Sequence, residues 1–221
     1  MGKSLVPDYI TPITGWRFWR IFGNKSKTAD PLWLGSIVRS QLWPPKERLE
    51  AECGESGSSH TGSLKVYCKW GISAYKSFQY ALEDFNERVA KARQRLGFEP
   101  GTVLGKVKLW GKIHQHQYGY RAQFAYPFSL VSGVCINCLR LFDLKSEDFI
   151  LRYFTFGSGW LFHYNKENFP PEIFPGELMC SRCIDWIAEV DLERDEVLSS
   201  LEKKYGIEIE ESPLLSSILN K

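Results

Sequence analysis

Four cysteines in the last third of the chain form two C-x-x-C pairs. Cys135-Ile-Asn-Cys138 and Cys180-Ser-Arg-Cys183 are separated by 41 residues. Each pair can turn two thiolates toward one point, and two such pairs supply the four sulfur ligands of a closed tetrahedral zinc site. A fully coordinated ion leaves no position for water or substrate, so we expect this zinc ion to be structural. An iron–sulfur centre and four unconnected cysteines are the alternatives.

A second group of residues with metal-ligand chemistry lies around a Gly/Ser-rich loop. Cys53, His60 and Cys68 could form a metal site that His116 or His114 completes from a later hairpin. The alternative is a pair of buried free cysteines beside an exposed loop histidine, because free cysteine is among the most buried residue types. A third interpretation is an enzyme in which Cys68 is the nucleophile and His114 the base.

A basic and aromatic surface is predicted on the hairpin at 103–126. Its first strand alternates, so that Val103, Val107, Leu109 and Ile113 face inward. Cations and a ring on the outward face offer phosphate neutralisation beside a stacking platform, which indicates nucleic-acid binding. The alternative is a solvated strand face whose tryptophan packs under a helix. The candidate nucleic-acid-binding residues are Lys106, Lys108, Trp110, Lys112 and Arg121.

Sequence signatures of the common catalytic sites are missing from the chain. The segment from Gly101 to Val107 has one residue too few between its glycines for a Walker A loop, and Val107 stands where a Ser or Thr must hold magnesium. There is no H-E-x-x-H or G-x-S-x-G motif and no paired-carboxylate signature. We therefore expect a protein that binds rather than catalyses.

Composition indicates a globular chain that needs no disulfides for its core. The 221 residues are 43% hydrophobic and 24% charged, and no stretch approaches the ~18 apolar residues of a membrane span. The N-terminal residues lack the apolar core of a signal peptide, so a cytoplasmic location is expected, in which cysteines are reduced. Residues 1–130 carry a net charge of +9 and residues 131–221 one of −7. The basic part could attract an anionic partner, or the two parts could dock on each other.

The elements that must position these residues follow from the hydrophobic periodicity. An amphipathic helix is predicted over 73–96, and strands precede and follow it. After the first cysteine pair we expect a hairpin and then an acidic amphipathic helix over 184–205 that Gly206 ends. The fold class is α+β: a β-rich barrel or sheet with one long helix, followed by a zinc-stabilised hairpin-helix segment. The predicted divisions are a lead-in at 1–14, a β-rich domain at 15–130, a zinc-binding segment at 131–206 and a tail at 207–221.

Two resemblances support this division. The motifs G-W-R-F-W, G-K-V-K-L-W-G and G-Y-R-A-Q-F-A-Y-P make residues 15–130 similar to an uncharacterised bacterial domain family, which implies one folding unit and no particular activity. A knuckle, a hairpin and a helix whose first turn holds the last two ligands make residues 131–206 resemble the treble-clef zinc fold; a zinc ribbon is the alternative. Treble-clef segments occur in nucleic-acid binders, protein adaptors and some nucleases. His163 alone on the hairpin argues against a nuclease.

The sequence therefore predicts a non-catalytic zinc-containing protein that binds DNA or RNA through its basic N-terminal part. One version of this hypothesis makes the protein a subunit of a larger complex. A protein–protein adaptor that docks through the acidic C-terminal helix and the tail is the alternative, and an enzyme with a Cys/His site comes third. No membrane association is expected.

Overall fold

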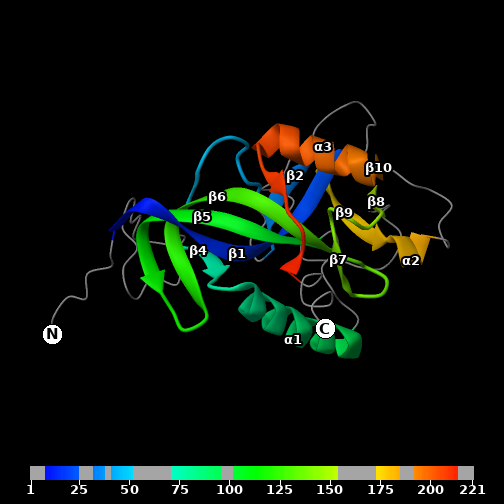
Figure 1. Ribbon diagram of the computed structural model, residues 1–221, viewed down its shortest axis with the longest axis horizontal. Helices are drawn as coiled ribbons and strands as arrows, with labels where there is room; N and C mark the ends of the chain where they lie inside the picture. The colour runs from blue at the N-terminus through cyan, green and yellow to red at the C-terminus, as the bar shows by residue number, and fades with distance from the viewer. Residues whose placement is uncertain are drawn as a thin grey trace.

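The computed structural model describes residues 8–24, 32–37, 41–51, 71–95, 102–153, 173–184 and 192–213 (Figure 1). Within these ranges the fold is mostly β-sheet with a few helices, so the α+β class holds in this broad sense. The eleven strands are β1 (Asp8–Asn24), β2 (Trp33–Ser36), β3 (Leu49–Glu50), β4 (Ile72–Tyr75), β5 (Thr102–Gln115), β6 (Gly119–Val134), β7 (Leu141–Asp143), β8 (Phe149–Tyr153), β9 (Ile173–Cys180), β10 (Leu192–Glu193) and β11 (Glu208–Ile209). The helices are α1 (Phe78–Arg95), α2 (Ser181–Ile184) and α3 (Arg194–Tyr205).

Three long strands, β1, β5 and β6, form the middle of the sheet. The β5 strand pairs antiparallel with both β1 and β6. The short β4 pairs with β6 and, at Trp16↔Tyr75, with β1. Strands β1, β5, β6 and β4 therefore form a closed circuit of pairings, which we call the four-strand circuit. All strand pairs are antiparallel except that of β11 with β6.

The alternation predicted for β5 is confirmed. Val103, Val107, Leu109 and Ile113 are at most 2% exposed, and all four belong to the largest core cluster. Branched apolar side chains at every second position of a strand place one face in the core, as expected for a half-buried strand. The opposite face of β5, which carries the predicted basic residues, lies outside this core.

The second edge of β6 is covered by four short strands from distant parts of the chain. Along β6 these are β4, β3, β11 and β7, which begin at Ile72, Leu49, Glu208 and Leu141. Strand β6 thus passes the predicted boundary at residue 130 without a break. Strand β9 pairs with β1, so the later part of the chain adds to the same sheet.

Helix α1 begins five residues later than the predicted start at 73. Residues Ile72–Tyr75 pair with β6 as β4 instead, and the Ser77 hydroxyl accepts a hydrogen bond from the Tyr80 N–H at 3.2 Å, which caps the first turn. The predicted apolar side of this helix is present at Phe85 and Val89, which are buried. Ala81, which the periodicity did not single out, is buried beside them, and all three pack in one cluster with Phe18, Leu104 and Val134. Residues 73–75 fit the helical periodicity, but their pairing with β6 makes them part of a strand.

The single helix predicted over 184–205 is wrong, because Leu192–Glu193 is a strand that pairs with β8. Helix α3 begins after it with a capping box between Glu193 and Glu196 and ends at Gly206, the predicted stop, which has φ +62°. The apolar side of α3 packs on the largest core cluster, whereas α1 covers a separate cluster. The two helices lie on opposite sides of the long strands in Figure 1. Among the described residues no helix is long and apolar enough to cross a membrane.

Candidate metal centre

The first cysteine pair lies in a tight turn that follows β6. Cys135 is fully buried, and the Leu139 N–H donates to its carbonyl oxygen at 2.9 Å while its own N–H donates to the Arg140 carbonyl at 3.0 Å. Leu139 has φ +56°, a conformation that reverses the chain directly after Cys138. The Ile136 N–H donates to Leu178 O at 2.9 Å, which joins this turn to β9.

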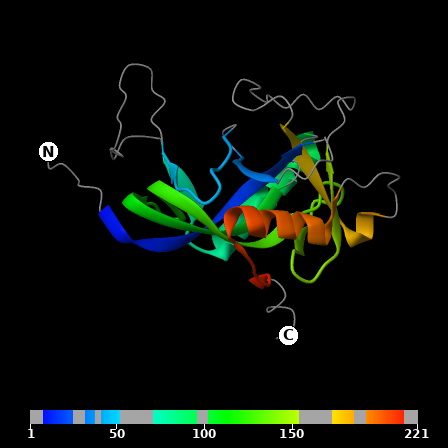
Figure 2. The ribbon, with the colours of Figure 1, turned by 90° about the horizontal axis from the view of Figure 1, so that it is seen from above.

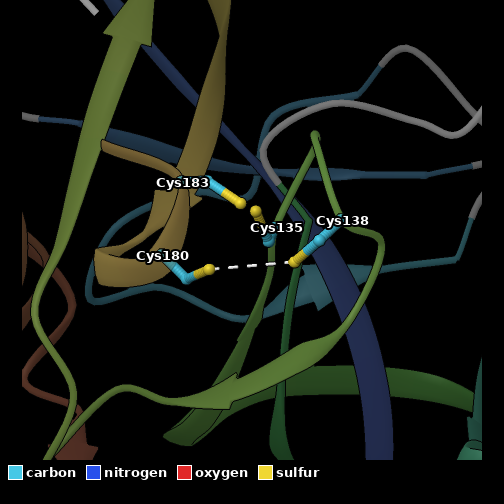
Figure 3. Close-up of side chains that lie close together, drawn as sticks. All are labelled: Cys135, Cys138, Cys180 and Cys183. Carbon is cyan, nitrogen blue, oxygen red and sulfur yellow. Dashed lines mark hydrogen bonds between the residues drawn. The ribbon is translucent and has the colours of Figure 1, made fainter. Parts of the chain in front are cut away.

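The second pair lies where β9 passes into α2. Cys180 is the last residue of β9 and pairs with Phe149 of β8, and Cys183 lies within the single turn of α2. The Ser181 N–H donates to Asp148 O at 2.9 Å, which holds the start of that turn against the end of β8. The hairpin and short helix therefore present both cysteines toward the turn after β6, as Figure 3 shows.

The four sulfur atoms form one cluster, with every Sγ within 4.8 Å of the others. Cys138 Sγ and Cys180 Sγ are 3.8 Å apart (Figure 3). Sulfur atoms on the corners of a tetrahedron with a Zn–S distance of ~2.3 Å are ~3.8 Å apart, whereas a disulfide requires ~2.05 Å. The cluster can hold a metal ion such as zinc, and all four cysteines are free thiols.

The burial of the thiols makes them costly to ionise without a cation. Cys135 and Cys180 are fully buried, Cys183 is 7% exposed, and Cys138 is the least buried of the four. Burial and the neighbouring thiols raise the pKa of Cys183 to about 12, although a hydrogen bond with Asn137 opposes this. A divalent ion would reverse the balance, since a coordinating thiol is deprotonated outright.

An arginine not singled out by the sequence analysis lies beside the cluster. Arg140 donates to both carboxylate oxygens of Glu147, at 3.2 and 2.5 Å, and this pair raises the pKa of Arg140, with a smaller contribution from Cys180. Its Nε is buried and has no hydrogen-bond partner. A positive charge next to a cluster of thiolates offsets part of their negative charge and orients them. An arginine two residues after a cysteine pair belongs to no recognised motif, so a single sequence does not mark it as part of the site.

The other predicted ligands do not form a described site. Cys53, His60 and Cys68 lie outside the described residues, as does His163. His116 and His114 are adjacent, with His116 Nε2 and His114 Nδ1 3.1 Å apart at the end of the β5–β6 hairpin. Partial burial lowers the pKa of His116, and the nearby cationic side chains lower it further.

Lys106 and Lys108, which were predicted for the basic face of the β5–β6 hairpin, have an acidic or an aromatic partner. Lys106 forms an ion pair with Glu210 and lies over the Trp16 ring. Lys108 is exposed and its Nζ lies 4.2 Å from the centroid of Phe128. Trp110 packs on Phe124, with ring centroids 6.0 Å apart, rather than under α1.

The two other candidate residues of this face lie near the hairpin end. Lys112 follows Gly111, whose φ of +72° marks an irregularity in the pairing with β6. Arg121 pairs across the strands with His114. In Figures 1 and 2 this end of the hairpin and the cysteine cluster beside α2 lie at opposite ends of the molecule.

The chain was compared with protein-family models, curated proteins and solved structures. It matches none of them. The resemblance of residues 15–130 to an uncharacterised bacterial family therefore stays a prediction. Among the described residues, the thiol cluster and the basic hairpin carry chemistry from which a function can be proposed.

Proposed function

We propose that the protein is a non-catalytic zinc-containing protein that binds nucleic acid through the β5–β6 hairpin. The observation that carries the zinc part is the convergence of four free thiols within 4.8 Å of one another. Two ligands come from the turn after β6, one from the end of β9 and one from the helical turn α2, an arrangement that supports a treble-clef-like zinc segment. Because four sulfur ligands complete the coordination, zinc would serve the fold here and not a reaction.

The chemistry of the zinc part would come from this chain's own residues. Cys135, Cys138, Cys180 and Cys183 would hold the ion and join the turn after β6 to the end of β9. Arg140 would stabilise the thiolate form of the cluster, and its Glu147 partner would fix its orientation. Zinc supplies a fixed tetrahedral cross-link when bound.

The nucleic-acid part rests on the charge distribution of the hairpin. No Asp or Glu occurs between Glu99 and Asp143, although this stretch contributes β5 and β6, the two strands of the hairpin. Its lysines therefore meet no carboxylate from their own strands, and rings lie between them. Lys108 is exposed, and Lys106 and Lys112 are partly exposed. The cations of such a surface can bind phosphates, and its rings can stack on bases, without a preference for a particular nucleotide sequence. Lys106 would contribute least, because Glu210 already neutralises it.

The test is a fluorescence-anisotropy titration of single- and double-stranded DNA and RNA at two salt concentrations. The double variant Lys108→Gln/Lys112→Gln should weaken binding to every sequence and reduce the salt slope by roughly 1.8 for duplex DNA, about 0.9 for each lost phosphate contact. Lys203→Gln, on the exposed side of α3, is the matched control and should change neither quantity. Equal affinities for the wild type and the double variant would contradict the proposal and favour a protein partner.

A further inference from the structure

The side chain of Arg17 lies on the core face of β1, inside the four-strand circuit. Strand β1 pairs with β5 without irregularity from Ile13 to Arg20. A Cβ placed on Gly15 would meet Ala74 Cβ at 2.8 Å, so this face of β1 points into the circuit. Arg17 follows on the same face, and Trp19, the next residue on that face, belongs to the largest core cluster.

The guanidinium of Arg17 is incompletely satisfied in this position. Its Nη1 donates to the Ser73 carbonyl oxygen, and its Cζ lies 5.3 Å from the centroid of the Trp43 ring. Its Nε is buried and has no acceptor, and within the described ranges no carboxylate forms an ion pair with it. Burial lowers the pKa of Arg17 to about 10. A partly buried cation whose Nε has no acceptor is costly to fold around.

A second buried donor belongs to Trp19, which lies on the same face of β1 as Arg17. The Trp19 ring nitrogen is buried and has no partner. The Trp19 and Trp43 rings pack edge to face with centroids 5.6 Å apart, so Arg17 and Trp19 are both neighbours of the Trp43 ring. The Trp43 ring N–H is already used, since it donates to Ser36 Oγ at 3.1 Å. Arg17 Nε and Trp19 Nε1 are thus two buried donors beside one indole that have no acceptor among the described residues.

We propose that Arg17, Trp19 and Trp43 form a binding site for an oxyanion group, a phosphate or a carboxylate, of a small ligand that enters the four-strand circuit. Arginine presents Nε and an Nη in a planar fork that matches two oxygens of such a group. The Trp19 N–H can donate to the same group, and the Trp43 ring provides an apolar wall for the ligand's body. Arg17 is only partly buried and Ser73 is exposed, so the guanidinium end is reachable from the solvent.

This inference does not depend on the proposed function, because the hairpin cations lie on the other face of the strands. A water molecule could also satisfy the two donors, but it would leave the charge of Arg17 uncompensated. A carboxylate of the chain itself would compensate it and close the site. The experiment must therefore distinguish the binding of an external anion from a bound water molecule and from a carboxylate of the chain.

Thermal unfolding and isothermal titration of the full chain provide the test, with inorganic phosphate, adenosine 5′-monophosphate, benzoate and uncharged adenosine as probes. We expect at least one of the three anions to raise the Tm. Uncharged adenosine should not raise it. Arg17→Met should remove this rise and weaken the anion's binding by about tenfold or more, since hydrogen bonds to charged groups are the strong ones. Arg48→Met is the matched control, because Arg48 also lies over a ring, that of Phe124, but on the exposed surface.

Arg17→Lys covers the case in which the Met variant does not fold. It keeps the positive charge but loses the fork, so it should fold and still bind the anion more weakly than the wild type. The inference is overturned if no anion raises the Tm of the wild type. It is also overturned if Arg17→Met or Arg17→Lys binds as tightly as Arg48→Met, or if a crystal structure shows a carboxylate of this chain on Arg17 Nε.

Discussion

The most direct prediction concerns Cys138→Ser, which separates metal coordination from packing. The other three cysteines are buried, so a serine there would also place a hydroxyl in the core. Cys138 is the exposed member of the cluster, and its Sγ lies 3.8 Å from that of Cys180. Without metal this substitution should therefore change stability by less than about 0.5 kcal/mol, the range of ordinary surface changes.

The magnitude with metal follows from the number of ligands. Structural zinc sites of four ligands are worth about 10 to 16 kcal/mol of apparent binding free energy, or about 2.5 to 4 kcal/mol for each ligand. Cys138→Ser should accordingly lower zinc affinity by roughly 10²- to 10³-fold. The strand pairs around the site, β8 with β9 and β6 with β7, are held by backbone hydrogen bonds that this substitution does not remove. The variant should therefore remain folded.

The assay is native mass spectrometry for bound zinc, combined with thermal unfolding with and without a chelator. The wild type should hold one ion at this cluster and lose stability on chelation, whereas Cys138→Ser should show a much smaller difference between the two conditions. Ser181→Ala, which changes an exposed residue beside Cys180, is the control and should behave as the wild type. A metal-dependent rise in Tm that is equal in Cys138→Ser and the wild type would refute the four-thiol assignment.

Three further predictions concern the stability of the fold. Burial tends to raise the pKa of Glu210, but the hydrogen bond and charge of its lysine partner lower it overall. The stabilisation from this ion pair is present above pH ~4.3, the unfolded pKa, and is lost as the pH falls through the lower folded pKa. Between pH 7 and pH 3 the wild type should therefore lose up to about 1 kcal/mol more stability than Glu210→Gln in urea unfolding. Tyr205→Phe removes a buried hydroxyl that accepts from the Leu34 N–H at 2.9 Å and donates to the Trp43 carbonyl at 3.0 Å, and should lower the urea midpoint by an amount equal to about 1 to 3 kcal/mol with an unchanged m-value. Gly206→Ala meets no atom within 4 Å but must adopt φ +62°, so it should cost about 1 kcal/mol in thermal unfolding, and Gly206→Asn should cost less.

Local patterns predicted those parts of the fold that depend on one element and its core face. The inward residues of β5 and the buried Phe85 and Val89 on α1 follow directly from periods of two and 3.6. The start of α1 and the division of the C-terminal helix were missed because pairing with β6 and β8 decides them. Such pairings join residues far apart in the chain, and a single sequence carries no sign of them.

The cysteine cluster was predictable because its ligands are chemically unusual and occur at a fixed spacing. Arg140, Arg17 and Trp19 carry no such signal. Arg17 and Trp19 belong to an ordinary strand alternation, and Arg140 lies between two leucines outside any motif. Their importance appears only when burial and missing acceptors are known. The neutralisation of Lys106 by Glu210 was missed for the same reason, because 104 positions separate the two residues.

The covering of β6 by four short strands also constrains the order in which the protein can be made. While the chain emerges from the ribosome, β6 can pair with β5 and β4 at once, but its backbone at Ser129 and Leu130 must wait for β11, about eighty residues later. Until then the nascent strand offers open N–H and C=O groups that a neighbouring chain could join. Chains interrupted before residue 206 should accordingly depend on chaperones and aggregate, even though every residue of the β5–β6 hairpin has already been synthesised.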